Sequence, residues 1–174
     1  MIEMKLPFLR KAITGDVPLV VSMSGARLGD AVLFAGRSAS LVLPLAARTG
    51  LSGRCVVVGQ PESTARLEAA ATRAGLLIET AEQFPADRSF ELAVVEATAD
   101  WTAAGAGARK SVRDGGRIII VAGSPREGLL ARLSAKPPEI SADAIIETLS
   151  SQGWRRARPI GARDGLVFVE AFAS

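Results

Sequence analysis

Short apolar runs alternate with longer amphipathic segments along most of this chain. The first run covers 31–34 and the second covers 55–58. Between them lie a loop of small residues and an Ala-rich segment that ends at Gly50 and Gly53. Short β-branched runs are typical of buried strands, whereas longer Ala- and Leu-rich segments are typical of helices. The order predicts a strand, helix, strand unit with a right-handed crossover, in which the two strands lie parallel.

The same alternation predicts the elements that follow. We expect helices over 61–74, 100–112 and 141–152, and strands over 76–79, 90–95 and 117–122. Gly105 and Gly107 lower the helix propensity of the second of these helices. The segment 123–138 reads as a loop, and we expect it to cover one side of any site at the carboxyl edge of the sheet.

The end of the chain departs from this alternation. Two strand-like segments, the basic 154–160 and the apolar 166–172, flank Asp164 and Gly165, which are a hairpin signal. The last two strands should therefore be antiparallel. The dinucleotide-binding Rossmann order ends instead with a parallel strand, so the hairpin favours a different doubly wound fold.

Residues 1–28 precede the first strand and read as a helical extension. An amphipathic helix is plausible near its start, and a second short helix after Pro18 would carry Leu19, Met23 and Leu28 on one face. We expect this extension to cover the sheet edge or the mouth of the site. No internal repeat is visible, and the whole chain, 1–174, is predicted to be a single domain.

Composition narrows the class of protein. With 174 residues, 48% of them hydrophobic and 22% charged, the chain is long and apolar enough for one compact core. The net charge of +3 is small, and no stretch is long enough for a membrane span or resembles a signal peptide. A lone cysteine, Cys55, lies in an apolar run and is interpreted as a core residue. These features predict a cytoplasmic protein.

The absence of histidine and tyrosine excludes several kinds of chemistry. A Ser-His-Asp triad is impossible, and the commonest zinc ligand is missing, so no metal site is expected. Arg155, Arg156, Arg158 and Arg163 form the densest basic patch. It leaves RNA binding open as an alternative, although scattered cations elsewhere fit a solvated surface better and nucleic acid is not the expected partner.

Four stretches in order resemble class I S-adenosylmethionine-dependent methyltransferases. They are VLFAGRSAS at 32–40, the segment 79–96 with its aromatic-acid-apolar strand, VRDGGRIIIV at 112–121, and the closing GW and DGLVFVEA motifs. The resemblance covers nearly the whole chain from Asp30 onward. It implies an α/β, Rossmann-like class I methyltransferase fold, with a seven-stranded, mostly parallel sheet, an antiparallel C-terminal hairpin and helices on both faces.

The resemblance also implies where S-adenosylmethionine would lie. The cofactor-binding positions it assigns are Phe34, Gly36, Ser38 and Ser40 for the methionine end, Gly59 and Gln60 for the ribose, and Thr80, Ala81 and Glu82 for the adenine. Several of these differ from the family pattern. Phe34 replaces an acid, Ser38 and Ser40 replace glycines, and Gln60 stands where an acid usually accepts the ribose hydroxyls. Pro44 would interrupt an early turn of the helix after the loop if that helix began at Ser40.

The function implied is methyl transfer to a small-molecule acceptor. Such transfer depends mainly on holding the nucleophile and the methyl group in line, so no special base is obligatory. Glu96, after the fourth strand, is the predicted catalytic carboxylate if a proton must be accepted, and its alternative interpretation is a strand-end or helix-capping acid. Asp100 and Trp101 would shape the acceptor pocket, although Trp101 suits core packing equally well.

Two other functional classes remain open. The altered loop and the missing ribose acid favour a non-catalytic methyltransferase-like domain that serves as a binding or dimerisation module, and a homodimer is possible in either case. An NAD-type dehydrogenase is disfavoured because the Gly-x-Gly-x-x-Gly spacing is absent.

Overall fold

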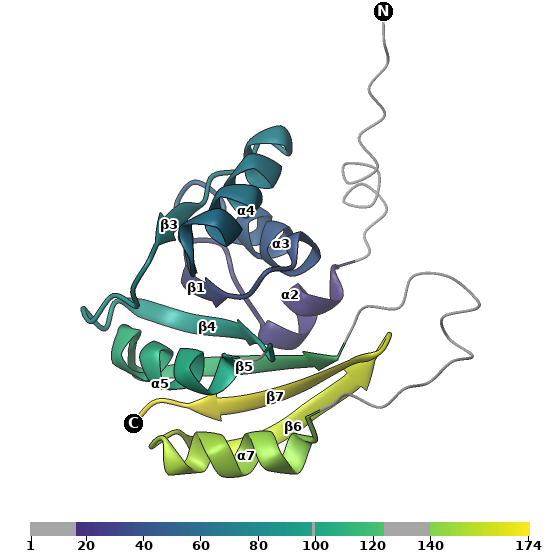
Figure 1. Cartoon of the computed structure of the whole chain (residues 1–174), viewed down its shortest axis with the longest axis vertical. Coiled ribbons are helices and arrows are strands. Elements are labelled where there is room, and N and C mark those ends of the chain that lie inside the picture. The colour runs from purple at the N-terminus through teal and green to yellow at the C-terminus, as the bar shows by residue number, and fades with distance from the viewer. Residues whose placement is uncertain (1–16, 99, 124–139) are drawn as a thin grey trace, which may run out of the picture.

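The computed structural model describes residues 17–98, 100–123 and 140–174. Figure 1 shows one sheet with helices on both of its faces. The helices are α2 (Leu19–Ser24), α3 (Ala39–Thr49), α4 (Pro61–Arg73), α5 (Trp101–Ser111) and α7 (Ala142–Ser151). The strands are β1 (Ala31–Ala35), β2 (Arg54–Val58), β3 (Glu79–Ala81), β4 (Phe90–Glu96), β5 (Val112–Gly123), β6 (Arg155–Arg163) and β7 (Leu166–Phe172).

The seven strands form one sheet in the order β3-β2-β1-β4-β5-β7-β6. Strands β1 to β5 pair in parallel, whereas β7 is antiparallel to both β5 and β6. Asp164 and Gly165 have φ values of 53° and 82°, the left-handed pair that a two-residue type I′ turn requires. The predicted fold class and its antiparallel terminal hairpin are therefore confirmed.

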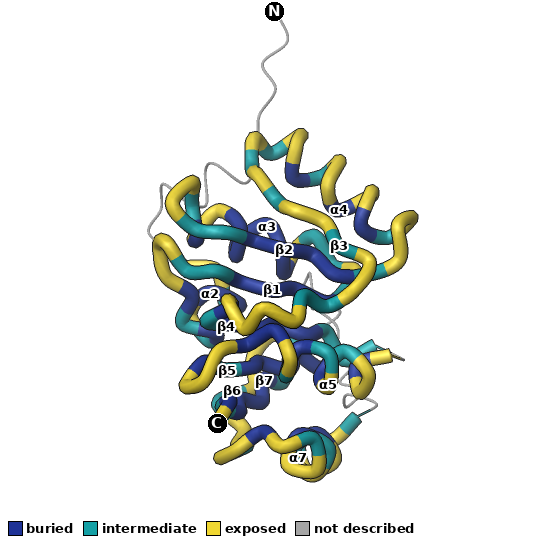
Figure 2. The backbone as a smooth tube through the Cα atoms, turned by 90° about the vertical axis from the view of Figure 1, so that its left-hand side faces the viewer, coloured by how far each residue is buried: buried dark blue, intermediate teal, exposed yellow. Residues whose placement is uncertain are grey.

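Alternate residues of the central strands pack against different helices. In β1, Val32 and Phe34 belong to the core shared with α2, α3 and α4, whereas Leu33 and Ala35 belong to the core shared with α5 and α7. Both faces of the sheet are therefore buried, as the continuous apolar runs of parallel strands require. Figure 2 shows the central strands in the dark blue of buried residues, with exposed residues on the outer sides of the helices.

Helix α3 runs through Pro44, so the expectation that this proline would interrupt it is wrong. A proline inside a helix removes one hydrogen bond to the carbonyl four residues earlier. Here that carbonyl belongs to Ser40, an exposed residue in the first turn, where water can replace the lost donor. The Pro44 ring itself is buried. Burial of the ring offsets the loss of the bond.

Strand β3 begins later than predicted. The apolar run at 76–79 suggested a strand, but the paired residues are Glu79–Ala81. The reason is the end of α4: Gly75 has a φ of 69°, and the Leu76 N–H donates to the Ala71 carbonyl at 2.9 Å. This closing turn directs Leu76 and Ile78 against the core, so their side chains pack there before the strand starts.

The predicted helix after Pro18 is confirmed over Leu19–Ser24, while Leu28 lies outside it and is 71% exposed. The expected helix near the chain start and most of the loop at 123–138 lie outside the described residues. Their predicted roles around the site stay predictions.

Two further expectations concern the burial of Cys55 and the apolar length of the helices. Cys55 is buried in β2, and burial, helped by Glu79, raises the pKa of its thiol to about 12. It is therefore a core residue, as predicted. Among the residues that the structure describes, no helix has the length and apolar character needed to cross a membrane.

Candidate functional site

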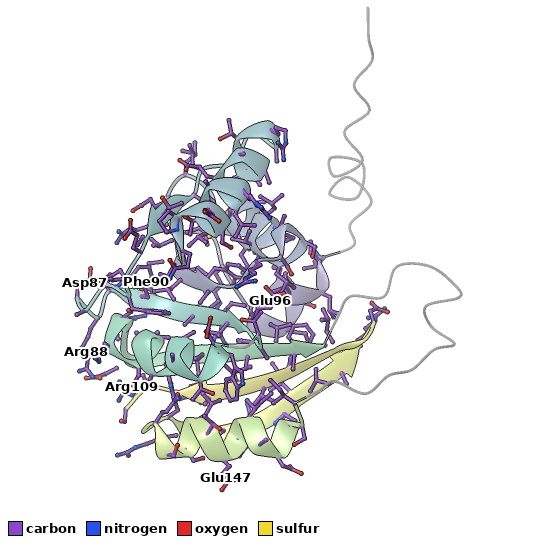
Figure 3. The ribbon with its side chains drawn as sticks, viewed as in Figure 1. Asp87, Arg88, Phe90, Glu96, Arg109 and Glu147 are labelled. Atoms are coloured by element: carbon purple, nitrogen blue, oxygen red, sulfur yellow. The ribbon has the colours of Figure 1, made fainter. Side chains whose placement is uncertain are left out.

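Parallel pairing brings the predicted cofactor-binding segments to one edge of the sheet. Ala35, the last residue of β1, pairs with Val58 in β2 and with Val95 in β4. The loop that begins at Gly36 therefore lies between Gly59 and Glu96, which follow those partners directly. Figure 3 shows Glu96 at this end of β4, and Asp87, Arg88 and Phe90 toward the other end. The candidate site is the carboxyl edge of the three central strands.

The Glu96 carboxylate is bound by the loop between β1 and α3. Its Oε2 atom accepts hydrogen bonds from the main-chain N–H groups of Arg37, at 2.6 Å, and Ser38, at 3.1 Å. Its Oε1 atom accepts from the Ser38 hydroxyl. The N-terminus of α3 adds a partial positive charge at the same place. The loop is thus a cradle of donors that converge on a carboxylate.

Ser38 is the N-cap residue directly before α3, and its hydroxyl has an unusual partner. At this position a serine side chain normally accepts a hydrogen bond from the first helical turn. Ser38 makes no such bond and donates its hydroxyl to Glu96 instead. The substitution of serine for the family's glycine therefore adds one side-chain donor to the cradle.

Gly36 allows the close approach of Glu96. A Cβ atom added at Gly36 would lie 2.6 Å from Glu96 Oε2, 2.7 Å from Glu96 Cβ and 2.8 Å from Phe34 Cζ. Real Cβ atoms do not come so close to other heavy atoms. Only glycine fits here without displacing its neighbours, so the one glycine kept from the family pattern has a direct steric role.

Phe34 is fully buried, with a relative exposure of 0%. Its side chain belongs to the core shared with α2, α3 and α4, beneath the loop. Any contact between this position and a ligand would therefore involve main-chain atoms. The structure keeps Phe34 as a packing residue under the site.

The residues predicted for the ribose and adenine lie farther along the same edge. Gln60 is exposed, and its side chain does not cap α4, which begins at the next residue. The Gly59 N–H donates to the Ala81 carbonyl at 3.1 Å, which ties this turn to the end of β3. Thr80 and Glu82 are exposed. These residues therefore lie at or directly after the carboxyl ends of β2 and β3.

Two residues expected near the acceptor have clear positions. Trp101 is 7% exposed and packs in the core on the α5 side of the sheet, so the structure favours the packing interpretation. Asp100 is the N-cap residue directly before α5 and is exposed. No group of three or more His, Cys, Asp or Glu side chains suited to a metal ion occurs in the described segments.

Sequence reasoning found Glu96 but not its partners. A carboxylate after β4 was expected to face an acceptor, whereas the structure turns it toward the loop after β1. The available signal was the parallel pairing of β1 with β4, because it places the residue after one strand beside the loop after the other. The sequence does not show which way the side chain turns.

Comparison with solved structures agrees with this fold. The chain superposes on a SAM-dependent methyltransferase from Aquifex aeolicus with a TM-score of 0.73 and 18% identity, covering 91% of this chain and 90% of the other. It also matches a SAM-dependent O-methyltransferase from Thermotoga maritima, with a TM-score of 0.65 and 14% identity over 89% of this chain and 63% of the other. It further matches the [4+2]-cyclase SpnF with a TM-score of 0.65 and 12% identity, covering 89% of this chain and 79% of the other.

These similarities define the class of fold. The chain has the fold of class I S-adenosylmethionine-dependent methyltransferases, with the candidate site at the edge where open α/β sheets bind their ligands. No protein-family model matches the sequence, and neither does any curated protein. Identities of 12–18% establish the fold, while activity has to be argued from the site.

Proposed function

We propose that this protein binds S-adenosylmethionine at the carboxyl edge of β1, β2 and β4 and transfers its methyl group to a small-molecule acceptor. The observation that carries the proposal is the donor cradle formed by Arg37 and Ser38 opposite the Glu96 carboxylate. It stands at the predicted position of the methionine end, on a fold shared with proteins described as SAM-dependent methyltransferases.

The chemistry of this cradle fits an amino acid group. Main-chain N–H groups at a helix N-terminus suit a carboxylate, and the Glu96 carboxylate suits an ammonium group. The methionine end of the cofactor carries both charges. For the Arg37 and Ser38 N–H groups to hold its carboxylate, Glu96 would have to leave them and turn to the ammonium. The exposed Gln60 amide would accept or donate one ribose hydrogen bond.

A small acceptor suits the charge of this edge. Arg37 is the only Lys or Arg within the segments 34–40, 59–62, 80–82 and 96–98 that form the described site. Nucleic acids are held largely through contacts between cations and phosphates, which this edge does not supply. A neutral or weakly charged small molecule is therefore the better proposed acceptor.

The cofactor, when bound, would supply an activated methyl group on a sulfonium. The chain's own part is to orient this group and to exclude water from it. Both Glu96 oxygens are used by the loop, so a role in accepting a proton would require one of them to leave Arg37 or Ser38. We therefore propose a binding role for Glu96 first and proton acceptance only for acceptors that must lose a proton.

The test is calorimetric titration of the full chain with S-adenosylmethionine and S-adenosylhomocysteine. We expect saturable binding of both, and roughly tenfold weaker binding in Glu96→Gln, because the ammonium loses a charged partner worth on the order of 1.5 kcal/mol. Glu68→Gln, an exposed change on α4, is the matched control and should bind as the unchanged protein does. An absence of heat and of any thermal shift at millimolar ligand would refute the proposal.

A second candidate function has its own supporting observation. Glu96 already accepts the hydrogen bonds that the Arg37 and Ser38 N–H groups can donate. The loop therefore needs no ligand to be stable, and Glu96 acts as a cap of α3. A non-catalytic methyltransferase-like domain that serves as a binding or dimerisation module would keep this arrangement. In that case Glu96→Gln lowers stability but changes no cofactor affinity, because there is none to change.

A further inference from the structure

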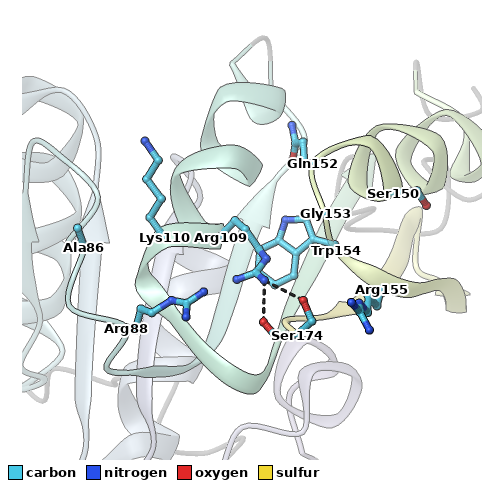
Figure 4. A pocket seen from close by; sticks show the side chains of 10 residues that line it. All are labelled: Ala86, Arg88, Arg109, Lys110, Ser150, Gln152, Gly153, Trp154, Arg155 and Ser174. Atoms are coloured by element: carbon cyan, nitrogen blue, oxygen red, sulfur yellow. Dashed lines mark hydrogen bonds between the residues drawn. The ribbon is translucent and has the colours of Figure 1, made fainter.

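A basic cavity lies at the opposite edge of the sheet from the candidate cofactor site. Its volume is about 830 Å³. The residues that line it are Ala86, Arg88, Arg109, Lys110, Ser150, Gln152, Gly153, Trp154, Arg155 and Ser174. They come from the segment before β4, the ends of α5 and α7, the start of β6 and, after β7, from Ser174. Figure 4 shows this cavity with Arg109 at its centre.

The described side chains that line the cavity carry charge of one sign only: four are cations and none is an Asp or Glu. Arg155 and Lys110 are exposed, and the Arg88 side chain, 51% exposed, extends toward Arg109 in Figure 4. Four cations around one hollow repel each other unless an anion lies among them. The lining therefore has the composition of an anion site.

Arg109 is held rigidly at the centre of this group. Its Nη2 atom donates to the Ser174 carbonyl at 2.8 Å and to the Ser174 hydroxyl at 3.1 Å. Its guanidinium lies 5.6 Å from the centre of the Trp154 ring, and the Trp154 indole is fixed in turn by a bond to the Gly105 carbonyl at 3.2 Å. Nη1 is buried and has no hydrogen-bond partner among the described residues. Arg109 therefore contributes a fixed positive charge to the lining, and a fixed side chain loses little conformational entropy when an anion binds beside it.

Arg88 adopts a backbone conformation that is costly for arginine. Its φ is 52°, in the left-handed region where glycine is the favoured residue. Such a non-glycine residue costs on the order of 1 kcal/mol, and these residues concentrate at functional sites. The Arg88 guanidinium forms an exposed ion pair with Asp114 at 3.3 Å, and an exposed pair of this kind contributes little to stability. The pair alone does not explain why arginine occupies this position.

The negative groups nearby only partly offset these cations. Helices α5 and α7 both end at this edge, and each helix C-terminus contributes about half a negative charge. Asp114 contributes one more through Arg88. These groups are fewer than the four cations, so the lining keeps a positive excess. The last carbonyls of α7 are satisfied by main-chain bonds to Gln152, Gly153 and Trp154, so the cavity cations are not needed to cap that helix.

We infer that this cavity is a second ligand site, which binds the phosphate group of a small phosphorylated molecule. Arg88, Arg109, Lys110 and Arg155 supply the charge, and the hollow is open enough to solvent for such a molecule to enter. The inference does not depend on the proposed methyl transfer, because the cavity lies at the amino edge of β4 and β5, away from Glu96.

The test uses inorganic pyrophosphate as the probe, titrated into the full chain by calorimetry at low salt. We expect saturable binding at one site. The variants Arg88→Gly and Lys110→Gln should each weaken it at least fivefold. Arg88→Gly should also leave the melting temperature unchanged or raise it, because glycine suits the left-handed backbone. A merely structural role for Arg88 predicts a lower melting temperature and no change in pyrophosphate binding, which would overturn the inference.

Two controls separate a built site from general basic charge. Arg73→Gln removes one exposed cation from α4, on the other side of the sheet, and should leave pyrophosphate binding unchanged. Equal weakening in Arg73→Gln would overturn the inference. Single-stranded RNA provides the second control. RNA binding that pyrophosphate does not compete for, and that Arg156→Gln weakens as much as Lys110→Gln does, would assign the charge to a polynucleotide surface instead.

Cofactor titrations keep the two proposals apart. S-adenosylhomocysteine binding should be the same in Arg88→Gly and in the unchanged protein, and pyrophosphate binding should be the same in Glu96→Gln. Either proposal can then fail while the other stands.

Discussion

At the scale of single residues, the candidate site depends on which side chains can approach the loop after β1. Glu96 reaches the N–H groups of Arg37 and Ser38 because the residue between them and β1 is glycine. Ser38 contributes its hydroxyl to the same carboxylate instead of capping α3. The serine is therefore not a neutral replacement for the family's glycine, since it fixes the carboxylate in place.

The substitution Gly36→Ala tests this close approach. The new methyl group would overlap Glu96 Oε2 and Phe34 Cζ, and Phe34 is buried and cannot easily move. We expect a loss of about 1–3 kcal/mol in the free energy of unfolding, as for other overpacked sites. Urea denaturation measures it. Gly59→Ala is the matched control, because its Cβ would meet only Thr64 Cγ2, at an ordinary 3.5 Å. An equal loss in both variants would contradict the steric role of Gly36.

Cys55 gives a prediction of pH dependence at the same scale. Burial raises the pKa of its thiol from 9.0 to about 12, so the folded protein holds this proton more tightly than the unfolded chain. The contribution to stability is complete below pH 9 and is lost as the pH rises toward 12, with a slope approaching about 1.4 kcal/mol per pH unit.

The measurement is urea denaturation between pH 8 and pH 10.5 for the unchanged chain and for Cys55→Ala. The alanine variant is less stable throughout, because it leaves a small cavity, but its stability should fall less steeply above pH 9. Parallel curves for the two proteins would show that Cys55 does not contribute to the alkaline loss.

At the scale of elements, the glycines of α5 have packing roles that outweigh their poor helix propensity. A Cβ at Gly107 would overlap the Phe84 ring, and one at Gly105 would lie 2.8 Å from Gln152 Oε1. The Gly105 carbonyl also accepts from the Trp154 indole. These contacts join α5 to the segment before β4 and to the turn after α7. The glycines therefore mark where other segments lie directly on the helix.

The variant Gly107→Ala separates propensity from packing. Alanine gains up to about 1 kcal/mol of helix propensity, whereas displacing Phe84 costs about 1–3 kcal/mol. We expect a net loss of stability in thermal denaturation. Thr102→Ala, at an exposed position of the same helix, keeps the propensity gain without the clash and should be neutral or stabilising. Stabilisation in both variants would contradict the packing role.

Helix α2 is attached to the sheet through an ion-pair group centred on Glu170. Arg117 donates from Nη2 to the Gly25 carbonyl at 3.0 Å, and its Nη1 lies 3.8 Å from Glu170 Oε1. The Glu170 carboxylate, 8% exposed, also accepts from Arg158 at 3.0 Å. Arg117 therefore bridges the C-terminal end of α2 and a buried carboxylate of β7, which holds the helix against β5.

Replacing Arg117 with Met should loosen α2 more than the rest of the fold. The change removes a charged hydrogen bond to Gly25, worth roughly 1.5–3 kcal/mol, and leaves Glu170 with Arg158 alone. Hydrogen exchange should accelerate at the amides of Val21, Ser22 and Gly25, which donate within and after the helix. Arg158→Met keeps the Gly25 bond and should leave those amides protected. Equal exchange in the two variants would contradict the anchoring role.

At the scale of the whole molecule, the two edges of the sheet have different chemistry. The carboxyl edge presents main-chain donors, the Glu96 carboxylate that they bind and small polar residues, whereas the amino edge presents a hollow lined by cations. The parallel arrangement of β1 to β5 produces this separation, because it puts every strand end of one kind on one side. The two proposed sites therefore lie at opposite ends of β4.

Much of the fold was predictable from the order of apolar runs. Continuous runs such as 31–34 predicted buried parallel strands, and the Asp164-Gly165 pair predicted the antiparallel hairpin, because both signals are local. The start of β3 and the path of α3 through Pro44 were not predictable. They depend on what Leu76, Ile78 and the proline ring pack against, which is a property of the assembled core.

The sequence by itself predicted the class of fold, the edge of the sheet at which a ligand would bind, and Glu96, Gly36 and Ser38 as candidate residues. The edge follows from the order of strands and helices, whereas the class of fold and the roles of these residues come from the resemblance to the methyltransferase family. Only the tertiary structure decided that Glu96 turns into the loop and that Phe34 lies in the core beneath it. It alone revealed the basic cavity, because Arg88, Arg109 and Arg155 are far apart in sequence and meet only where the ends of several elements converge.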